Sequence, residues 1–209
     1  MDAELLTRNF LFFFILPPWV VAGFIDWMTH RKSDIEHTSG LKESATHMLE
    51  MIEAAIPVIL GLFFHIDSLV LLLMIGAFVA HTLTGFWDVS YADKMRRISP
   101  TEQQCHAALQ VLPFSVVAFA LCLHWSGLTA LFDGSADFSF RLQENPLSLS
   151  ATVAFLAVVT VCLVVPYVEE LTRCIRAQKA DGVGEGQTAN GFGSCSPGVP
   201  RFLPTRRFP

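Results

Sequence analysis

The sequence predicts an all-α integral membrane protein, and three observations favour this fold class. Hydrophobic residues make up 52% of the 209 residues and charged residues only 16%, whereas soluble domains usually carry about 25% charged residues. Several segments approach the roughly 20 apolar residues that a helix needs to cross a bilayer core. Acidic and histidine side chains gather near the ends of these segments. The prediction is therefore a bundle of about five transmembrane helices with a polar metal-ligand cluster at the cytoplasmic ends of helices one to four.

The expected helices follow the apolar segments in chain order. They cover residues 9–30, 41–65, 67–88, 100–125 and 146–171. The link around residues 65–68 is so short that the second and third helices should form an antiparallel hairpin. The fourth helix should begin near Ser99 and Pro100, because a proline in the first turn and an early glutamate are typical of helix starts. Residues 1–176 would form the transmembrane domain, and the Gly/Pro-rich residues 177–209 a disordered C-terminal tail.

Lysine and arginine predict the orientation of the chain, because cytoplasmic loops carry an excess of both. Basic residues follow the first, third and fifth helices, as at Arg31, Arg97 and Arg176. The opposite side has only Arg8 and Arg141. The N-terminus is therefore expected outside, and the C-terminus in the cytoplasm.

Charge and cysteine usage exclude two classes of function. The net charge of −5 provides no basic patch for nucleic acid, so no nucleic-acid partner is expected. The five cysteines show no CxxC motif and no paired spacing. A disulfide framework or a cysteine zinc site is therefore not expected.

Acids and histidines concentrate on one expected membrane face. Residues three, four or seven apart share a face of a helix, so pairs such as Asp26 with His30 or His81 with Asp88 can point to a common axis. Polar groups inside a membrane usually face the bundle interior and are functional. His65 and His124 fall on the opposite side and are interpreted as interfacial residues. The candidate metal ligands are Asp26, His30, His37, Glu43, His47, Glu50, His81, Asp88, Glu102 and His106.

Several of these assignments carry a particular role. Glu50 is either a ligand or an acid that orients a ligand histidine, and it is one of two candidate catalytic acids. Glu53, one turn deeper, is the other, as a proton-relay acid. His37 would be a ligand from the loop between the first two helices. Glu169 and Glu170 are weaker candidates at the same face.

The ligand chemistry predicts two divalent metal ions. Two such ions would neutralise most of the clustered carboxylates, and mixed imidazole and carboxylate ligands suit iron first, with zinc or manganese as alternatives. Soluble di-iron bundles also project glutamates and histidines inward, but their Glu-x-x-His spacing is three, whereas the pairs here are four apart. The HxxxH and HxxHH clusters of membrane hydroxylases and desaturases are absent.

The leading hypothesis is a membrane metalloenzyme that hydroxylates or desaturates a lipid or another apolar substrate. No flavin or nucleotide motif is visible, so an external electron donor would be needed. A zinc-dependent hydrolase of a lipid amide or ester is the first alternative. A metal-ion transporter or sensor is the second. A b-type haem protein ranks last, because axial ligation does not need clustered acids.

Overall fold

The computed structural model describes residues 3–144 and 147–188, and all regular structure within them is helical. An isolated bridge pairs Phe64 with Leu142. The elements are α1 (Ala3–Phe10), the π-helical η1 (Leu11–Ile15), α2 (Leu16–Lys32), the 3-10 helix η2 (Ile35–His37), α3 (Gly40–Phe63), α4 (Ser68–Met95), α5 (Pro100–Leu123), α6 (Trp125–Asp133), α7 (Leu149–Val159), the π-helical η3 (Thr160–Val164) and α8 (Val165–Thr188).

Five helical spans are long and apolar enough to cross a membrane, as the sequence predicted. The first joins α1, η1 and α2, and the last joins α7, η3 and α8. Some boundaries differ from the prediction. The third span continues to Met95, and the fourth ends at Leu123, where a separate short helix begins. α8 continues to Thr188, past the predicted start of the tail, and the rest of that tail lies outside the described residues.

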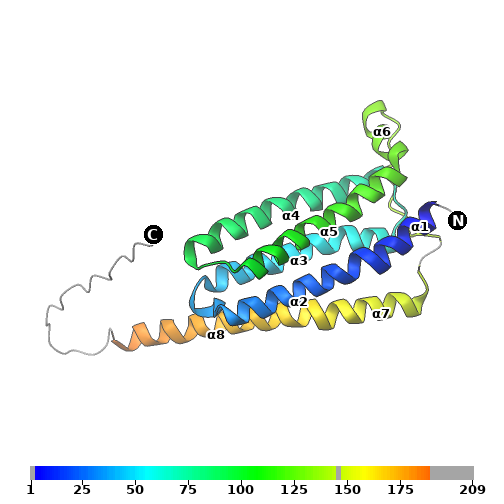
Figure 1. The fold of residues 1–209 in the computed structure, drawn as a ribbon. Helices are drawn as coiled ribbons and strands as arrows, with labels where there is room; N and C mark the ends of the chain where they lie inside the picture. The colour runs from blue at the N-terminus through cyan, green and yellow to red at the C-terminus, as the bar shows by residue number, and fades with distance from the viewer. Residues whose placement is uncertain (1–2, 145–146, 189–209) are drawn as a thin grey trace, which may run out of the picture.

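The spans run alongside one another as an elongated bundle (Figure 1). The α2–α3 and α4–α5 connections lie together at one end, and α8 projects beyond the bundle there. The α3–α4 link, α1 and α6 lie at the other end. A capping box starts α5: Ser99 Oγ accepts from the Glu102 backbone N–H, and the Glu102 side chain accepts from the Ser99 N–H. This cap confirms the helix start predicted at Ser99.

The distribution of polarity suits a lipid environment. Large apolar side chains are exposed along the spans, among them Phe14 at 67%, Leu83 at 65% and Val161 at 65%. In water, continuous apolar surface of this extent would be costly. The interior of the bundle, in contrast, contains buried acids and histidines at the end where the α2–α3 and α4–α5 connections lie.

An apolar cluster fills the other half of the bundle. It consists of Leu60, Val70, Leu71, Met74, Val116, Val117 and Ala120. These residues come from the far halves of α3 and α5 and the first turns of α4. The clustered buried acids and histidines thus lie at one end of the spans, and at the other end Asp67 and Ser68 are buried where they cap α4 and bond to Gly127.

Prolines account for local departures from regular helix. Pro166 cannot donate a backbone hydrogen bond and crowds the carbonyl four residues earlier, within η3. A π bulge adds a residue to the turn, and this rotates the following residues about the helix axis. Pro113 in α5 leaves the Leu109 carbonyl without its helical donor, and His81 Nε2 lies 3.3 Å from that oxygen. Neighbouring side chains commonly satisfy such freed carbonyls in membrane helices.

Candidate metal centre

All five spans contribute side chains to one buried polar cluster. Its imidazoles and carboxylates almost all have less than one-tenth of their surface exposed, and His30, Glu43 and Glu170 are 0% exposed. His106 is the most accessible, with 14% of its side chain exposed. The cluster consists of Asp26, His30, Glu43, His47, Asp88, Glu102, His106 and Glu170.

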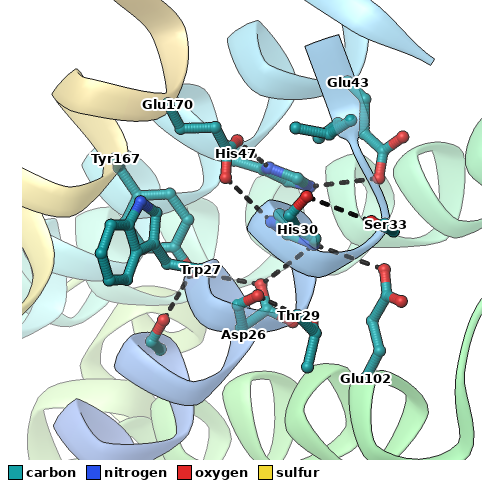
Figure 2. Close-up of polar contacts among 12 residues, drawn as sticks. Asp26, Trp27, Thr29, His30, Ser33, Glu43, His47, Glu102, Tyr167 and Glu170 are labelled. Atoms are coloured by element: carbon teal, nitrogen blue, oxygen red, sulfur yellow. Dashed lines mark hydrogen bonds and ion pairs between the residues drawn. The ribbon is translucent and has the colours of Figure 1, made fainter. Parts of the chain in front are cut away.

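Glu170 holds two of the histidines in place. Its Oε2 lies 3.0 Å from His30 Nδ1, and its Oε1 lies 2.9 Å from His47 Nδ1 (Figure 2). The rings are stacked, with centroids 4.4 Å apart and planes 5° from parallel. A carboxylate can only accept hydrogen bonds, so each Nδ1 must carry the hydrogen, and each neutral ring then keeps an Nε2 lone pair. Two imidazolium rings stacked this closely would repel each other, and a metal ion on either Nε2 would require that ring to be neutral.

The two Nε2 atoms face further carboxylates. His30 Nε2 lies 3.6 Å from Asp26 Oδ2 and 3.4 Å from Glu102 Oε1. His47 Nε2 lies 3.8 Å from Glu43 Oε1 and 3.4 Å from Asp88 Oδ2. Neither nitrogen makes a hydrogen bond that meets normal geometry, although both are buried.

Three overlapping sets of buried or partly buried ligand atoms have spacings that suit a metal ion, since their members lie within 4.8 Å of one another. The sets are His30 with Glu43 and Glu102; His47 with Glu43 and Asp88; and His30 with His47 and His106. Glu43 belongs to two of these sets.

Arg96 contributes a permanent positive charge to the same cluster. Its guanidinium pairs with both Glu43 and Glu102, through Nη2 in each case. Nη1 also donates to Glu102 Oε2 at 3.1 Å, and Nε donates to Glu43 Oε2 at 3.3 Å. Burial lowers the pKa of Arg96, but the hydrogen bonds to Glu102 and Glu43 outweigh this and raise it above its ordinary value. The guanidinium is thus a fixed cation beside two of the predicted ligands.

Asp26 connects the remaining polar groups. Its Oδ1 lies 3.3 Å from His106 Nε2, and its Oδ2 accepts from the Tyr167 hydroxyl at 3.2 Å. Tyr167 lies one turn before Glu170 on α8, so both side chains enter the cluster from the same face of that helix.

A small cavity adjoins the cluster on its apolar side. Its volume is about 40 Å³, enough for a water or a diatomic molecule. Asp26, His47, Glu50, His81 and His106 contribute its polar wall, and the opposite wall includes Met51, Ala54 and Leu163. Glu50 Oε1 and His81 Nδ1 are buried without a hydrogen-bond partner. Because His81 Nε2 is already directed at Leu109, only Nδ1 remains available to a ligand.

Two predicted residues lie apart from the cluster. Glu53 Oε1 accepts from the Thr84 hydroxyl at 3.0 Å, and Glu53 lies in none of the groups with ligand spacing within the described residues. His37 is exposed on η2, where its Nδ1 lies 3.2 Å from Asp34 Oδ1. It belongs to a separate group with Asp34 and Glu36.

Some residues that bond to the acids and histidines of the cluster were not strong candidates from the sequence. Glu170 is only a weaker candidate in the sequence, and the spacing of acids and histidines points to neither Arg96 nor Tyr167. One signal was available: Tyr167, Glu170 and Cys174 are spaced three and four apart and share a buried face of α8.

Comparison with protein-family models, with curated proteins and with solved structures finds no match.

Proposed function

We propose that the protein is an integral-membrane metalloenzyme with a dinuclear centre. The main support is that Glu170 accepts hydrogen bonds from Nδ1 of both His30 and His47. The Nε2 atoms of the same two rings face carboxylates but make no hydrogen bond of normal geometry. Metal-ligating histidines almost always donate their other ring N–H to a carboxylate, a carbonyl or water. A carboxylate that orients two stacked imidazoles in this way is the arrangement expected behind two adjacent metal ligands.

Two ions fit the ligand sets better than one. His30 with Glu102 would serve one ion, His47 with Asp88 the other, and Glu43 would bridge them. Ions in dinuclear sites lie about 3.5–4 Å apart, comparable with the 4.4 Å between the ring centroids. Five carboxylates with one arginine leave an excess of negative charge, which two divalent ions would offset. Iron is the ion we favour, with zinc or manganese as alternatives.

The reaction we propose is oxidation of a lipid or another apolar molecule. The 40 Å³ cavity has an apolar wall beside its polar wall, which would suit an apolar substrate close to the metal ligands. Two reduced iron ions would supply the chemistry of dioxygen activation. In a hydroxylation, R–H, O₂, two electrons and two protons give R–OH and H₂O, and an external protein donor supplies the electrons. Glu50, with its unpartnered Oε1 in the cavity wall, is the acid placed to carry a proton.

A zinc-dependent lipid amide or ester hydrolase is the second candidate, and one observation favours it. A cavity of about 370 Å³ between the ends of α2 and α5 is lined by Lys32, Ser33, Arg97 and Glu102, among others. It gives water and a polar headgroup a path to the Glu102 edge of the centre. A zinc-bound water would then act as the nucleophile.

The apolar half of the bundle argues against a transporter. A conducting path needs polar groups through the full membrane depth, but the cluster around Leu71, Met74 and Val117 fills the far half. For orientation, we propose the N-terminus outside and the C-terminus and metal centre on the cytoplasmic face, since the basic loops lie at that end.

Elemental analysis of detergent-purified protein, together with an optical spectrum, tests the proposal. About two irons per chain without a haem band support the oxidase, whereas zinc would give first place to the hydrolase. His47→Ala and His106→Ala should each lower the metal content sharply while membrane insertion is retained.

His65→Ala and His124→Ala are the matched controls, because both histidines lie at the opposite end of the spans. Their metal content should equal that of the unmodified protein. Protein without metal after preparation in metal-supplemented medium, or variants at His47 and His106 that keep full metal content, would contradict the proposal.

A further inference from the structure

A side opening between α4 and α5 leads from the lipid-facing surface to the metal centre. A cavity of about 400 Å³ lies there, lined by Gly85, Phe86 and Val89 of α4 and Ala107 and Gln110 of α5, and it extends to Glu50, Asp88 and His106. Small-ligand pockets typically have about 300–1,000 Å³. The opening lies inside the spans Ser68–Met95 and Pro100–Leu123, so it faces the hydrocarbon region. Its outer edge is apolar, with Phe86 77% exposed.

We infer that this opening admits a single hydrocarbon chain, which reaches the proposed metal centre past Gly85 when the Gln110 side chain rotates away from it. This inference rests on the proposed function and names the part of the substrate that enters. It also predicts a binding site that exists without any metal.

The width of the opening depends on Gly85. A Cβ built at Gly85 would overlap the Gln110 side-chain amide, so that amide lies directly against the glycine backbone. The same Cβ position is 3.6 Å from Glu50 Oε1, a buried oxygen without a hydrogen-bond partner. Gln110 is a flexible side chain, and its rotation would leave a narrow slot between a glycine and Ala107. A slot of one side chain's width suits an unbranched alkyl chain rather than a ring system.

Charge decides which end of a lipid enters. Among the residues that the structure describes, no lysine or arginine lines this cavity, and Glu50 and Asp88 lie at its inner end. An anionic phosphate or carboxylate headgroup would meet these acids without a counter-charge, which is unfavourable at membrane depth. The cavity between α2 and α5, by contrast, is lined by Lys32 and Arg97. The alkyl chain is therefore the part that the α4–α5 opening accepts.

Photolabelling with a fatty acid that carries a diazirine at its terminal carbon tests the inference. The metal-free full-length protein is placed in phosphatidylcholine nanodiscs with palmitic acid bearing an ω-diazirine, illuminated, and analysed by peptide mass spectrometry. Adducts are expected at the inner end of the cavity, on Glu50, Asp88 or His106 (the buried adducts). Excess unlabelled palmitate should suppress these adducts more than adducts on exposed residues such as Val161.

Substitutions on α4 and α5 should change this labelling in opposite directions. Gly85→Leu fills the slot and should lower the buried adducts about tenfold or more, because a packed site leaves no room for a chain. Gln110→Ala should raise them. Gly76→Leu is the matched control, because a Cβ at Gly76 meets nothing within 4 Å and Gly76 lies on the exposed side of the same helix. It should leave them unchanged.

Either of two results would overturn the inference. One is the lack of buried adducts in the unmodified protein. This result is also expected if a second copy of the chain covers the opening, and it would overturn the inference in that case too. The other is equal labelling of the Gly85→Leu and Gly76→Leu variants. The assay needs no metal, so the two proposals can fail separately. If the protein never binds metal but the buried adducts form, the proposed metalloenzyme is refuted and the opening for a hydrocarbon chain is supported. If the protein binds its full metal content but the buried adducts do not form, the opening is refuted and the proposed metal centre is supported.

Discussion

Replacing Glu170 by glutamine tests the central argument for the proposed metal centre. The carboxylate accepts from His30 Nδ1 at 3.0 Å and from His47 Nδ1 at 2.9 Å. An amide has one oxygen acceptor, and its other end donates. After Glu170→Gln, one imidazole therefore keeps its acceptor and the other faces an N–H group.

The expected loss follows from that single contact. A hydrogen bond to a charged group contributes about 1.5–3 kcal/mol, and about 1.4 kcal/mol corresponds to a tenfold change in affinity. Metal affinity should thus fall by about 10- to 100-fold, the range typical of carboxylates behind ligand histidines. The assay is a titration of metal-free protein in detergent with Zn²⁺ or Mn²⁺ against a chelating indicator. Unfolding midpoints measured without metal separate a general folding defect from a change at the site.

Glu169→Gln is the matched control. Glu169 is the neighbouring residue on the same helix, but it is 37% exposed and pairs with Arg31 at 3.5 Å and Arg173 at 3.4 Å. Exposed pairs of this kind contribute only about 0–1 kcal/mol, so metal affinity should change little. Unchanged affinity after Glu170→Gln, or an equal loss in both variants, would refute the reasoning.

Three further predictions concern the surroundings of the centre. Arg96→Gln removes the cation from two buried carboxylates, so the unfolding midpoint of metal-free protein should fall, and added Mn²⁺ should raise it more than in the unmodified protein; equal rises in thermal scans would contradict this. His81→Phe leaves the carbonyl freed by Pro113 unsatisfied and should cost about 1–3 kcal/mol in denaturant unfolding. The cost should be smaller in a Pro113→Ala background, which restores the helical N–H donor, and identical costs would exclude this role. At the surface, the hydrogen bond to Asp34 raises the pKa of His37 above its ordinary value; the pair therefore stabilises the fold at low pH and loses this effect as pH rises through that pKa. NMR titration after Asp34→Asn should show the His37 pKa lowered, and an unchanged pKa would contradict the assignment.

Much of the fold was predictable because it depends on local chain properties. Length and apolarity of the segments identified five spans, and the proline and early glutamate after Ser99 marked the start of one helix within a residue. Boundaries were less accurate where helices continue into water. α4 extends to Met95 and α8 to Thr188, because polar residues do not stop a helix once it leaves the apolar region.

The candidate site was predictable in part for a similar reason. Helical spacing brings Asp26 and His30, or Glu43 and His47, to one face of a helix, and both pairs lie in the cluster. His81 shows the limit of that argument. Its position on the inner face was predicted, but the use of its Nε2 depends on a carbonyl that Pro113 frees on another helix.

The sequence by itself determined that the chain forms apolar helices and that most of their acids and histidines share one end, because both follow from helical periodicity and membrane thickness. Only the tertiary structure decided which groups meet. The fifth span places Glu170 behind two histidines from different helices, and the turn between α4 and α5 brings Arg96 to two carboxylates. These contacts depend on the rotation of each helix about its axis and on the packing of distant segments. Neither is encoded in the local spacing of residues.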